Sequence, residues 1–177
     1  SFHAYASTQD HPQTWVRTVA EVRKALVEAG KPDMPIVDSE GGLNSKSFLR
    51  GLEHPTLPPE AKRTYDFLTA AELIVQWRVT LMAAGVKAHY YYFLIPGTLG
   101  RDANVGGVLS LTEATGGPIP AGVAQNNLVW QLDGGSFIQQ VEREAGLRCY
   151  LFGRKDKTIL AVLWAEDEAK FTLWGTA

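Results

Sequence analysis

Hydrophobic and polar residues follow two different periods along the first half of the chain, and these predict strands and helices in turn. A short apolar run at residues 2–7 predicts the end of a strand, and a second extended run at residues 35–40 ends at Gly41-Gly42. Between them, apolar residues recur at spacings of three and four, which predicts an amphipathic helix. They are Trp15, Val16, Val19, Val22, Leu26 and Val27. Gly30 stands where a left-handed residue would end that helix.

The same order continues with a longer helix and an aromatic strand. We expect the helix at residues 60–84, after the favourable start Pro58-Pro59, and the strand at residues 88–95. Strands that alternate with helices form a parallel sheet, because each helix carries the chain back to the edge where the next strand begins. In such sheets the functional loops follow the carboxyl ends of the strands. Here those loops would be at residues 7–13, 41–58 and 96–117.

The pattern changes after a last predicted helix at residues 120–132. Beyond Asp133-Gly134-Gly135, short runs bounded by turn residues predict an antiparallel sheet. We expect its strands at residues 137–142, 147–153, 158–166 and 170–174. The sequence therefore predicts two domains, an α/β domain at residues 1–133 and a small β-domain at residues 134–177.

Composition and charge exclude several classes of function. The 17 basic and 19 acidic side chains leave a net charge of −2, too balanced for a protein that binds nucleic acid or a membrane surface. No apolar run approaches the ~18–20 residues that span a bilayer. A single cysteine, Cys149, excludes an internal disulfide and a cysteine-based zinc site, and the 4 histidines lack the spacing of metal ligands. We therefore expect neither a metal nor another cofactor.

Glu40 is the first candidate for chemistry. It ends a buried strand and precedes two glycines, which would let a ligand or a neighbouring loop approach the carboxylate. A solvated loop glutamate would fit the position equally well. Strict alternation along the strand would place Asp38 and Glu40 on one face, about 7 Å apart. A buried Asp38 would need a partner, and we expect that partner in a part of the fold outside this chain.

Two other strand ends supply candidate partners for Glu40. His3 and Tyr5 point to one face of the strand that should neighbour the strand of Glu40. A tyrosine hydroxyl beside a carboxylate can donate a hydrogen bond that keeps the carboxylate ionised and oriented. The third strand carries consecutive rings from His89 onward. Most of these would pack in the core, and one or two near the end of the strand would offer a flat face to a sugar.

Together these strand ends resemble the C-terminal part of a retaining glycoside hydrolase of clan A, a TIM (β/α)8 barrel followed by a small β-domain. His3-Ala4-Tyr5 resembles the His-x-Tyr motif that often ends the sixth strand in that clan. Ser39-Glu40-Gly41-Gly42 resembles the nucleophile motif that ends the seventh strand. Tyr92 stands near the place of the aromatic platform at the end of the eighth strand, where the clan usually has tryptophan. The resemblance covers nearly the whole chain, and it depends on the order and spacing of these short motifs.

The resemblance implies catalytic roles for Glu40 and Tyr5 and substrate-binding roles for His3 and Tyr92. Glu40 would attack the anomeric carbon and form a covalent glycosyl-enzyme intermediate, while Tyr5 would hydrogen-bond to the carboxylate. His3 would order the sugar subsite, and Tyr92 would stack on the sugar ring. The substrate would be a carbohydrate, either an oligo- or polysaccharide or a glycoside, hydrolysed at an O-glycosidic bond.

A retaining enzyme also needs a second carboxyl group, and no carboxylate in this chain is a convincing candidate. In the clan that residue ends the fourth strand, which would precede Ser1. Glu113 lies in a loop without supporting neighbours, and Glu72 lies on a helix outside the barrel. Ser1 begins within a predicted element, with neither a methionine nor a leader. We therefore expect the chain to be a fragment, about strands six to eight of a barrel with the β-domain, and inactive by itself.

Two alternatives stay open at this stage. A non-catalytic carbohydrate-binding protein on the same scaffold would keep the aromatic platform without the missing acid. An unrelated α/β enzyme would use Glu40 only to cap structure, with its side chain directed away from His3, Tyr5 and Tyr92. The sequence does not assign a compartment, although secretion or export to the periplasm would suit an enzyme that processes polysaccharides.

Overall fold

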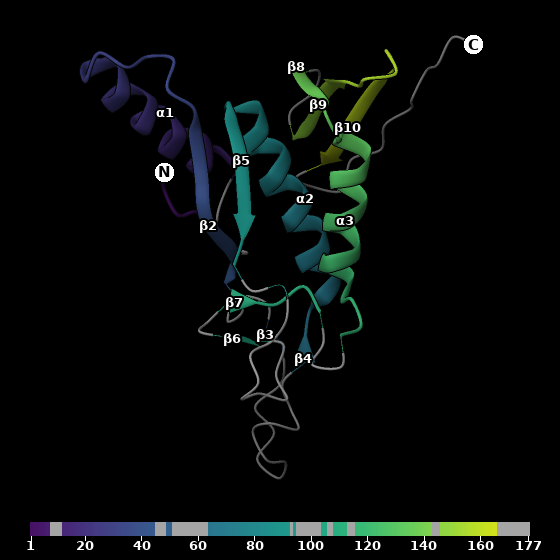
Figure 1. Cartoon of the computed structure of the whole chain (residues 1–177). Helices are drawn as coiled ribbons and strands as arrows, with labels where there is room; N and C mark the ends of the chain where they lie inside the picture. Colours follow the sequence, from purple (N-terminus) through teal and green to yellow (C-terminus); the bar gives the residue numbers. More distant parts are fainter. Residues whose placement is uncertain are drawn as a thin grey trace. The chain divides into compact units, whose positions relative to one another are not determined.

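A computed structural model describes residues 1–7, 12–44, 49–50, 64–92, 94, 104–105, 108–112, 116–142 and 146–165 of the chain. The chain divides into two compact units, Ser1–Trp130 and Gln131–Ala177, and each is described by itself. The domain boundary predicted between residues 133 and 134 stays a prediction. Figure 1 shows the elements of both units with their labels.

Three parallel strands form the centre of the first unit. β2 (Ile36–Asn44) lies between β1 (Tyr5–Ala6) and β5 (Val86–Tyr91), and both neighbours run parallel to it. The helices α1 (Pro12–Glu28) and α2 (Phe67–Ala83) carry the chain from each of these strands to the next. Figure 1 shows β2 and β5 side by side, with α2 next to β5. The predicted parallel sheet with crossover helices is confirmed.

Short strands extend this sheet beyond the end predicted for β2. The glycine pair does not end the strand, because Gly42 pairs with Tyr5 of β1. The last two residues of β2 then pair antiparallel with β7 (Val108–Leu109), which in turn pairs with β6 (Asn104–Val105). A separate ladder joins β3 (Leu49–Arg50) to β4 (Thr64–Tyr65).

Helix α2 begins later than predicted because its start is set by Asp66 rather than by the two prolines. The Oδ1 atom of Asp66 accepts a hydrogen bond from the backbone N–H of Thr69 (3.0 Å), and its Oδ2 atom accepts one from the Thr69 hydroxyl (2.8 Å). Residues 64–65 belong to a strand, and residues 60–63 lie outside the described residues. At the first helix, Gly30 adopts a φ of +71°, as its capping position predicts.

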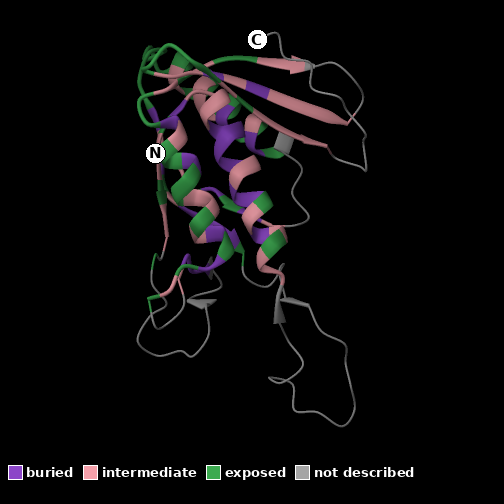
Figure 2. Ribbon diagram, turned by 90° about the vertical axis from the view of Figure 1, so that its right-hand side faces the viewer, coloured by how far each residue is buried: buried purple, intermediate pink, exposed green. Residues whose placement is uncertain are grey.

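The core of the first unit surrounds Trp77 of α2, whose side chain is fully buried. Its ring lies 6.4 Å from that of Trp15 in α1 and 6.4 Å from that of Tyr91 in β5, measured between centroids. Figure 2 shows α2 buried over much of its length, whereas α1 exposes its outer side. Helix α1 buries one stripe, with Trp15 and Val19 facing inward as the spacing predicted. Helix α3 (Pro120–Leu132), whose predicted bounds are confirmed, packs on the same unit through Ile119 and Ala121 at its start.

The second unit contains a three-stranded antiparallel sheet. β9 (Leu147–Gly153) lies between β8 (Ser136–Glu142) and β10 (Ile159–Ala165), close to the predicted strands. The aromatic side chains of the sheet contact one another. These rings belong to Phe137, Tyr150, Phe152 and Trp164. The predicted strand at residues 170–174 lies outside the described residues.

We predict that Gly41→Ala destabilises the first unit. A Cβ atom at this position would lie 2.5 Å from Oδ2 of Asp38 and 2.9 Å from Cε1 of His89, and it would overlap the carbonyl oxygen of Ala4. Overpacking of this kind lowers the free energy of unfolding by about 1–3 kcal/mol, which urea titration would measure. Gly153→Ala is the control, because its nearest neighbour would be 3.5 Å away. Equal stability of the two variants would contradict the prediction.

Candidate functional site

Glu40 and Tyr5 meet on two paired parallel strands, Glu40 within β2 and Tyr5 at the start of β1. The Tyr5 hydroxyl donates a hydrogen bond to Oε1 of Glu40 across 2.5 Å. On the other carboxylate oxygen, Oε2 lies 3.9 Å from Nδ1 of His3. The structure therefore brings together three of the four residues predicted from the strand ends, with Tyr5 bonded to one carboxylate oxygen of Glu40 and the His3 ring near the other.

Tyr92 lies at the border of the same site. Its backbone N–H donates to the carbonyl oxygen of Gly41 (2.7 Å), which places Tyr92 beside the residue that follows Glu40. An electrostatic interaction with Tyr92 contributes to the raised pKa of Tyr5. β5 ends one residue earlier, at Tyr91, so the predicted strand at residues 88–95 is too long.

The phenol of Tyr5 stays protonated over the physiological range. Burial, the hydrogen bond to Glu40 and the negative charge of that carboxylate together raise the pKa of Tyr5 to about 12. Tyr5 is thus a permanent donor to Glu40 at neutral pH. A carboxylate that accepts such a bond is held in one orientation.

A β-bulge separates Asp38 from Glu40 and places them on different faces of the sheet. Asp38 pairs with His89 and Gly41 pairs with Tyr91, so two residues of β2 lie opposite one residue of β5. The prediction that Asp38 and Glu40 share a face is wrong, because the extra residue interrupts the alternation. Asp38 is 0% exposed on the helix-covered face, whereas the Glu40 side chain is 36% exposed.

Asp38 finds its partners within this chain, and the expectation of a partner elsewhere is therefore wrong. Its Oδ1 atom accepts a hydrogen bond from the backbone N–H of Ala4 (3.0 Å), and the backbone N–H of Glu40 also donates to the carboxylate. Its Oδ2 atom lies 2.5 Å from Nδ1 of His89. A separation this short requires a proton between the two atoms.

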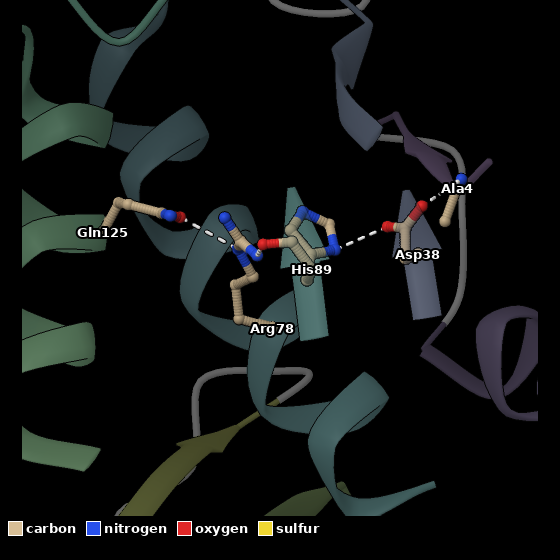
Figure 3. A network of polar contacts seen from close by, with 5 residues as sticks. All are labelled: Ala4, Asp38, Arg78, His89 and Gln125. Carbon is tan, nitrogen blue, oxygen red and sulfur yellow. Dashed lines mark hydrogen bonds and ion pairs between the residues drawn. The ribbon is translucent and has the colours of Figure 1, made fainter. Parts of the chain in front are cut away.

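A chain of polar contacts continues from His89 toward the helices (Figure 3). The carbonyl oxygen of His89 accepts a hydrogen bond from Nη1 of Arg78 in α2 (3.2 Å). Nε of Arg78 donates to Oε1 of Gln125 in α3 (2.9 Å). The His89 ring packs edge-on against Trp77, with 4.4 Å between centroids. The network therefore runs from Ala4, just before β1, through β2 and β5 to the helices α2 and α3.

Burial dominates the ionisation of Asp38. It raises the pKa of the carboxyl group to about 6, while the N–H groups of Ala4 and Glu40 and the charges of Arg78 and His3 oppose the rise. Burial also lowers the pKa of Arg78 to about 10, so the guanidinium stays charged at neutral pH. The buried network thus holds a permanent positive charge next to a carboxyl group that titrates near physiological pH.

Other kinds of site find no support in the part of the chain that the structure describes. There, no group of three or more His, Cys, Asp or Glu residues is arranged to hold a metal ion. No helix among the described residues has the length and hydrophobicity to cross a membrane. Glu113, the loop carboxylate considered above, lies outside the described residues, and Glu72 is exposed on α2.

A solved enzyme shares this fold. It is a family 39 glycoside hydrolase from the gut symbiont Bacteroides cellulosilyticus WH2, matched with a TM-score of 0.60 and 13% identity over 86% of this chain. The chain spans about a quarter of the matched enzyme's length, 27%. No family model matches the sequence, and no curated protein matches it significantly.

This comparison establishes the fold class. The chain is α/β, with a parallel β-α-β sheet followed by a small antiparallel three-stranded sheet, and this arrangement matches part of a glycoside hydrolase. The predicted fold class is confirmed.

Sequence reasoning missed the role of His89 as the partner of Asp38. The available signal was its place two residues before Tyr91 on a strand expected beside β2, together with an aspartate that needed a partner. The register that brings the two side chains together depends on the bulge, and no sequence pattern marks the bulge directly.

We predict that Asp38 makes the stability of the first unit depend on pH between about 4 and 6. Its pKa is higher in the folded chain than the ordinary value of 3.8, so in this window only the folded state retains the proton. The free energy of unfolding should therefore fall as pH rises, by up to about 3 kcal/mol from this group. In Asp38→Asn that fall should disappear.

Urea titrations followed by tryptophan fluorescence at several pH values would measure this effect, because Trp77 packs against His89. Asp33→Asn is the control, since Asp33 is exposed in a turn. A fall of the same size in Asp38→Asn would show that another group is responsible.

Proposed function

We propose that the chain forms the nucleophile-bearing part of a retaining glycoside hydrolase. The observation that carries the proposal is the 2.5 Å hydrogen bond from Tyr5 to Glu40 between adjacent parallel strands. The match to part of a glycoside hydrolase supports the same class of activity. The substrate is a carbohydrate, and the bond cleaved is an O-glycosidic bond.

In the proposed reaction Glu40 attacks the anomeric carbon as the leaving oxygen departs with a proton, and a glycosyl ester forms on the carboxylate. Water then hydrolyses the ester and releases Glu40. Tyr5 orients the Glu40 carboxylate through its hydrogen bond, His3 orders the sugar subsite, and Tyr92 stacks on the ring. Asp38 does not serve as the proton donor, because it is enclosed against His89 on the opposite face of the sheet.

The contacts of Glu40 argue against the alternative in which it only caps structure. That alternative predicts a side chain directed away from Tyr5 and His3. Instead, one oxygen accepts the Tyr5 hydrogen bond and the other lies 3.9 Å from the His3 ring.

We predict that a 2,4-dinitrophenyl 2-deoxy-2-fluoroglycoside labels Glu40. The dinitrophenolate departs without a proton donor, and the fluorine slows hydrolysis of the intermediate, so labelling does not require the second carboxyl group. Peptide mass spectrometry across a panel of sugars should locate the added mass on Glu40. Glu40→Gln should remain unlabelled, and Glu72→Gln, altered at an exposed helix position, should label like the wild type. A label on another carboxylate would overturn the assignment of the nucleophile.

We predict that Tyr5→Phe slows this labelling by about 10- to 100-fold. This factor corresponds to the free energy of one hydrogen bond to a charged group. Glu72→Gln is the control here as well, since Glu72 is exposed on α2, away from the strands that carry Tyr5 and Glu40. Both rates come from the time course of the mass shift. A similar rate in Tyr5→Phe and Glu72→Gln would show that the Tyr5 hydroxyl does not assist Glu40.

A carbohydrate-binding protein without catalysis is the second candidate. It is favoured by the exposed rings of Tyr90 (62%) and Tyr5 (39%), which offer flat apolar surfaces. It predicts saturable binding of a sugar, followed by changes in the tyrosine signals, with no covalent label on Glu40.

A further inference from the structure

Asp38 contacts all three parallel strands through one buried carboxylate. It accepts the backbone N–H of Ala4, the residue between His3 and Tyr5. It also accepts the backbone N–H of Glu40 and contacts His89 of β5. Because two of these donors belong to the backbone that carries Tyr5 and Glu40, moving the carboxylate would move both site residues.

Because of the β-bulge, Glu40 depends on Asp38 for support that regular strand pairing would otherwise give. In a regular strand the pairing of each residue with its neighbours would set the direction of Glu40, but the bulge leaves one residue outside the ladder. Backbone hydrogen bonds hold the strand on both sides of the bulge, from Ser39 to Phe2 (3.0 Å) and from Tyr92 to Gly41 (2.7 Å). The backbone N–H of Gly42 also donates to the carbonyl oxygen of Ala4 (3.2 Å), and the N–H of Glu40, within the bulge, donates to the Asp38 carboxylate as a further restraint.

His89 is itself held in place. Its ring packs against Trp77 at 4.4 Å, and its carbonyl oxygen accepts a hydrogen bond from Arg78. Gly41 leaves the space into which Asp38 and His89 approach. The carboxylate therefore cannot shift without disturbing groups that are buried in the core.

We propose that Asp38, backed by His89, is the positioning residue of the site: it holds the Ala4 and Glu40 backbones so that the Tyr5 hydroxyl and the Glu40 carboxylate meet on the opposite face. The consequence for catalysis rests on the proposed function of Glu40. The positioning itself is observable in the chain without any turnover.

The test follows the Tyr5–Glu40 hydrogen bond by NMR in protein that carries ¹³Cζ-labelled tyrosine, with Tyr5→Phe identifying the Tyr5 signal. The Glu40→Gln variant gives the reference chemical shift of Tyr5 Cζ when the acceptor of its hydrogen bond carries no charge. In the Asp38→Ala variant, the chemical shift of Tyr5 Cζ should move most of the way to the value measured in Glu40→Gln. Ile74→Ala is the matched control, because Ile74 is 0% exposed in α2 and its loss also destabilises the core.

An unchanged Tyr5 signal in folded Asp38→Ala would overturn the proposal. So would an equal shift in Ile74→Ala, which would mean that any loss of core stability disturbs the pair. If Asp38→Ala does not fold, Asp38→Asn decides the question, because it keeps the volume but offers one acceptor oxygen to two N–H groups. The Tyr5 signal should then move part of the way, and no movement would overturn the proposal.

The labelling reaction separates this proposal from the proposed function. In folded Asp38→Ala, labelling of Glu40 should slow about 100-fold, the effect of misplacing a reacting group by about 1 Å. A wild-type labelling rate in that variant would reject the positioning role and leave the function of Glu40 intact. A shifted Tyr5 signal in a chain whose wild type is never labelled would support positioning and reject the function.

Discussion

A buried carboxylate must find hydrogen-bond donors, and the first unit is arranged around that requirement at Asp38. An unpaired charge there would cost several kcal/mol, on the order of what a small domain has in total. The donors come from the β1 segment, from β2 itself and from β5. Small residues, Ala4 and Gly41, allow these backbones to approach. The Asp38 carboxylate thus joins the parallel strands at the point where their backbone pairing is irregular.

Because of the β-bulge, two acidic residues that are two positions apart face opposite sides of the sheet. Asp38 faces the helices, where it is enclosed with His89, and Glu40 faces the other side, where a ligand can reach it. A regular strand would have placed both on one face, with two negative charges close together and one of them without a donor. The irregularity therefore separates a structural carboxylate from the one that we propose as the nucleophile.

Sequence patterns predict the elements well and the local irregularities poorly. Spacing alone predicts the buried stripe of α1, the bounds of α3 and the meeting of Tyr5 with Glu40, because neighbouring parallel strands end at one edge. The start of α2 was misplaced, because two prolines are a stronger local signal than the Asp66 cap. The partner of Asp38 was missed because strict alternation of side chains along a strand does not allow for a β-bulge. A bulge depends on pairing between strands that are distant in sequence.

The consecutive rings of strand β5 have two different roles. His89 and Tyr91 turn inward, and the Tyr91 hydroxyl both donates to the carbonyl of Leu109 (2.6 Å) and accepts from the N–H of Leu43 (3.3 Å), joining β7 to β2. Tyr90, between them, is 62% exposed and makes no part of this scaffold. Substitutions along β5 should therefore be tolerated at alternate positions. In the proposed glycoside hydrolase, a change of preferred sugar can evolve at the outward positions while the inward ones keep the fold intact.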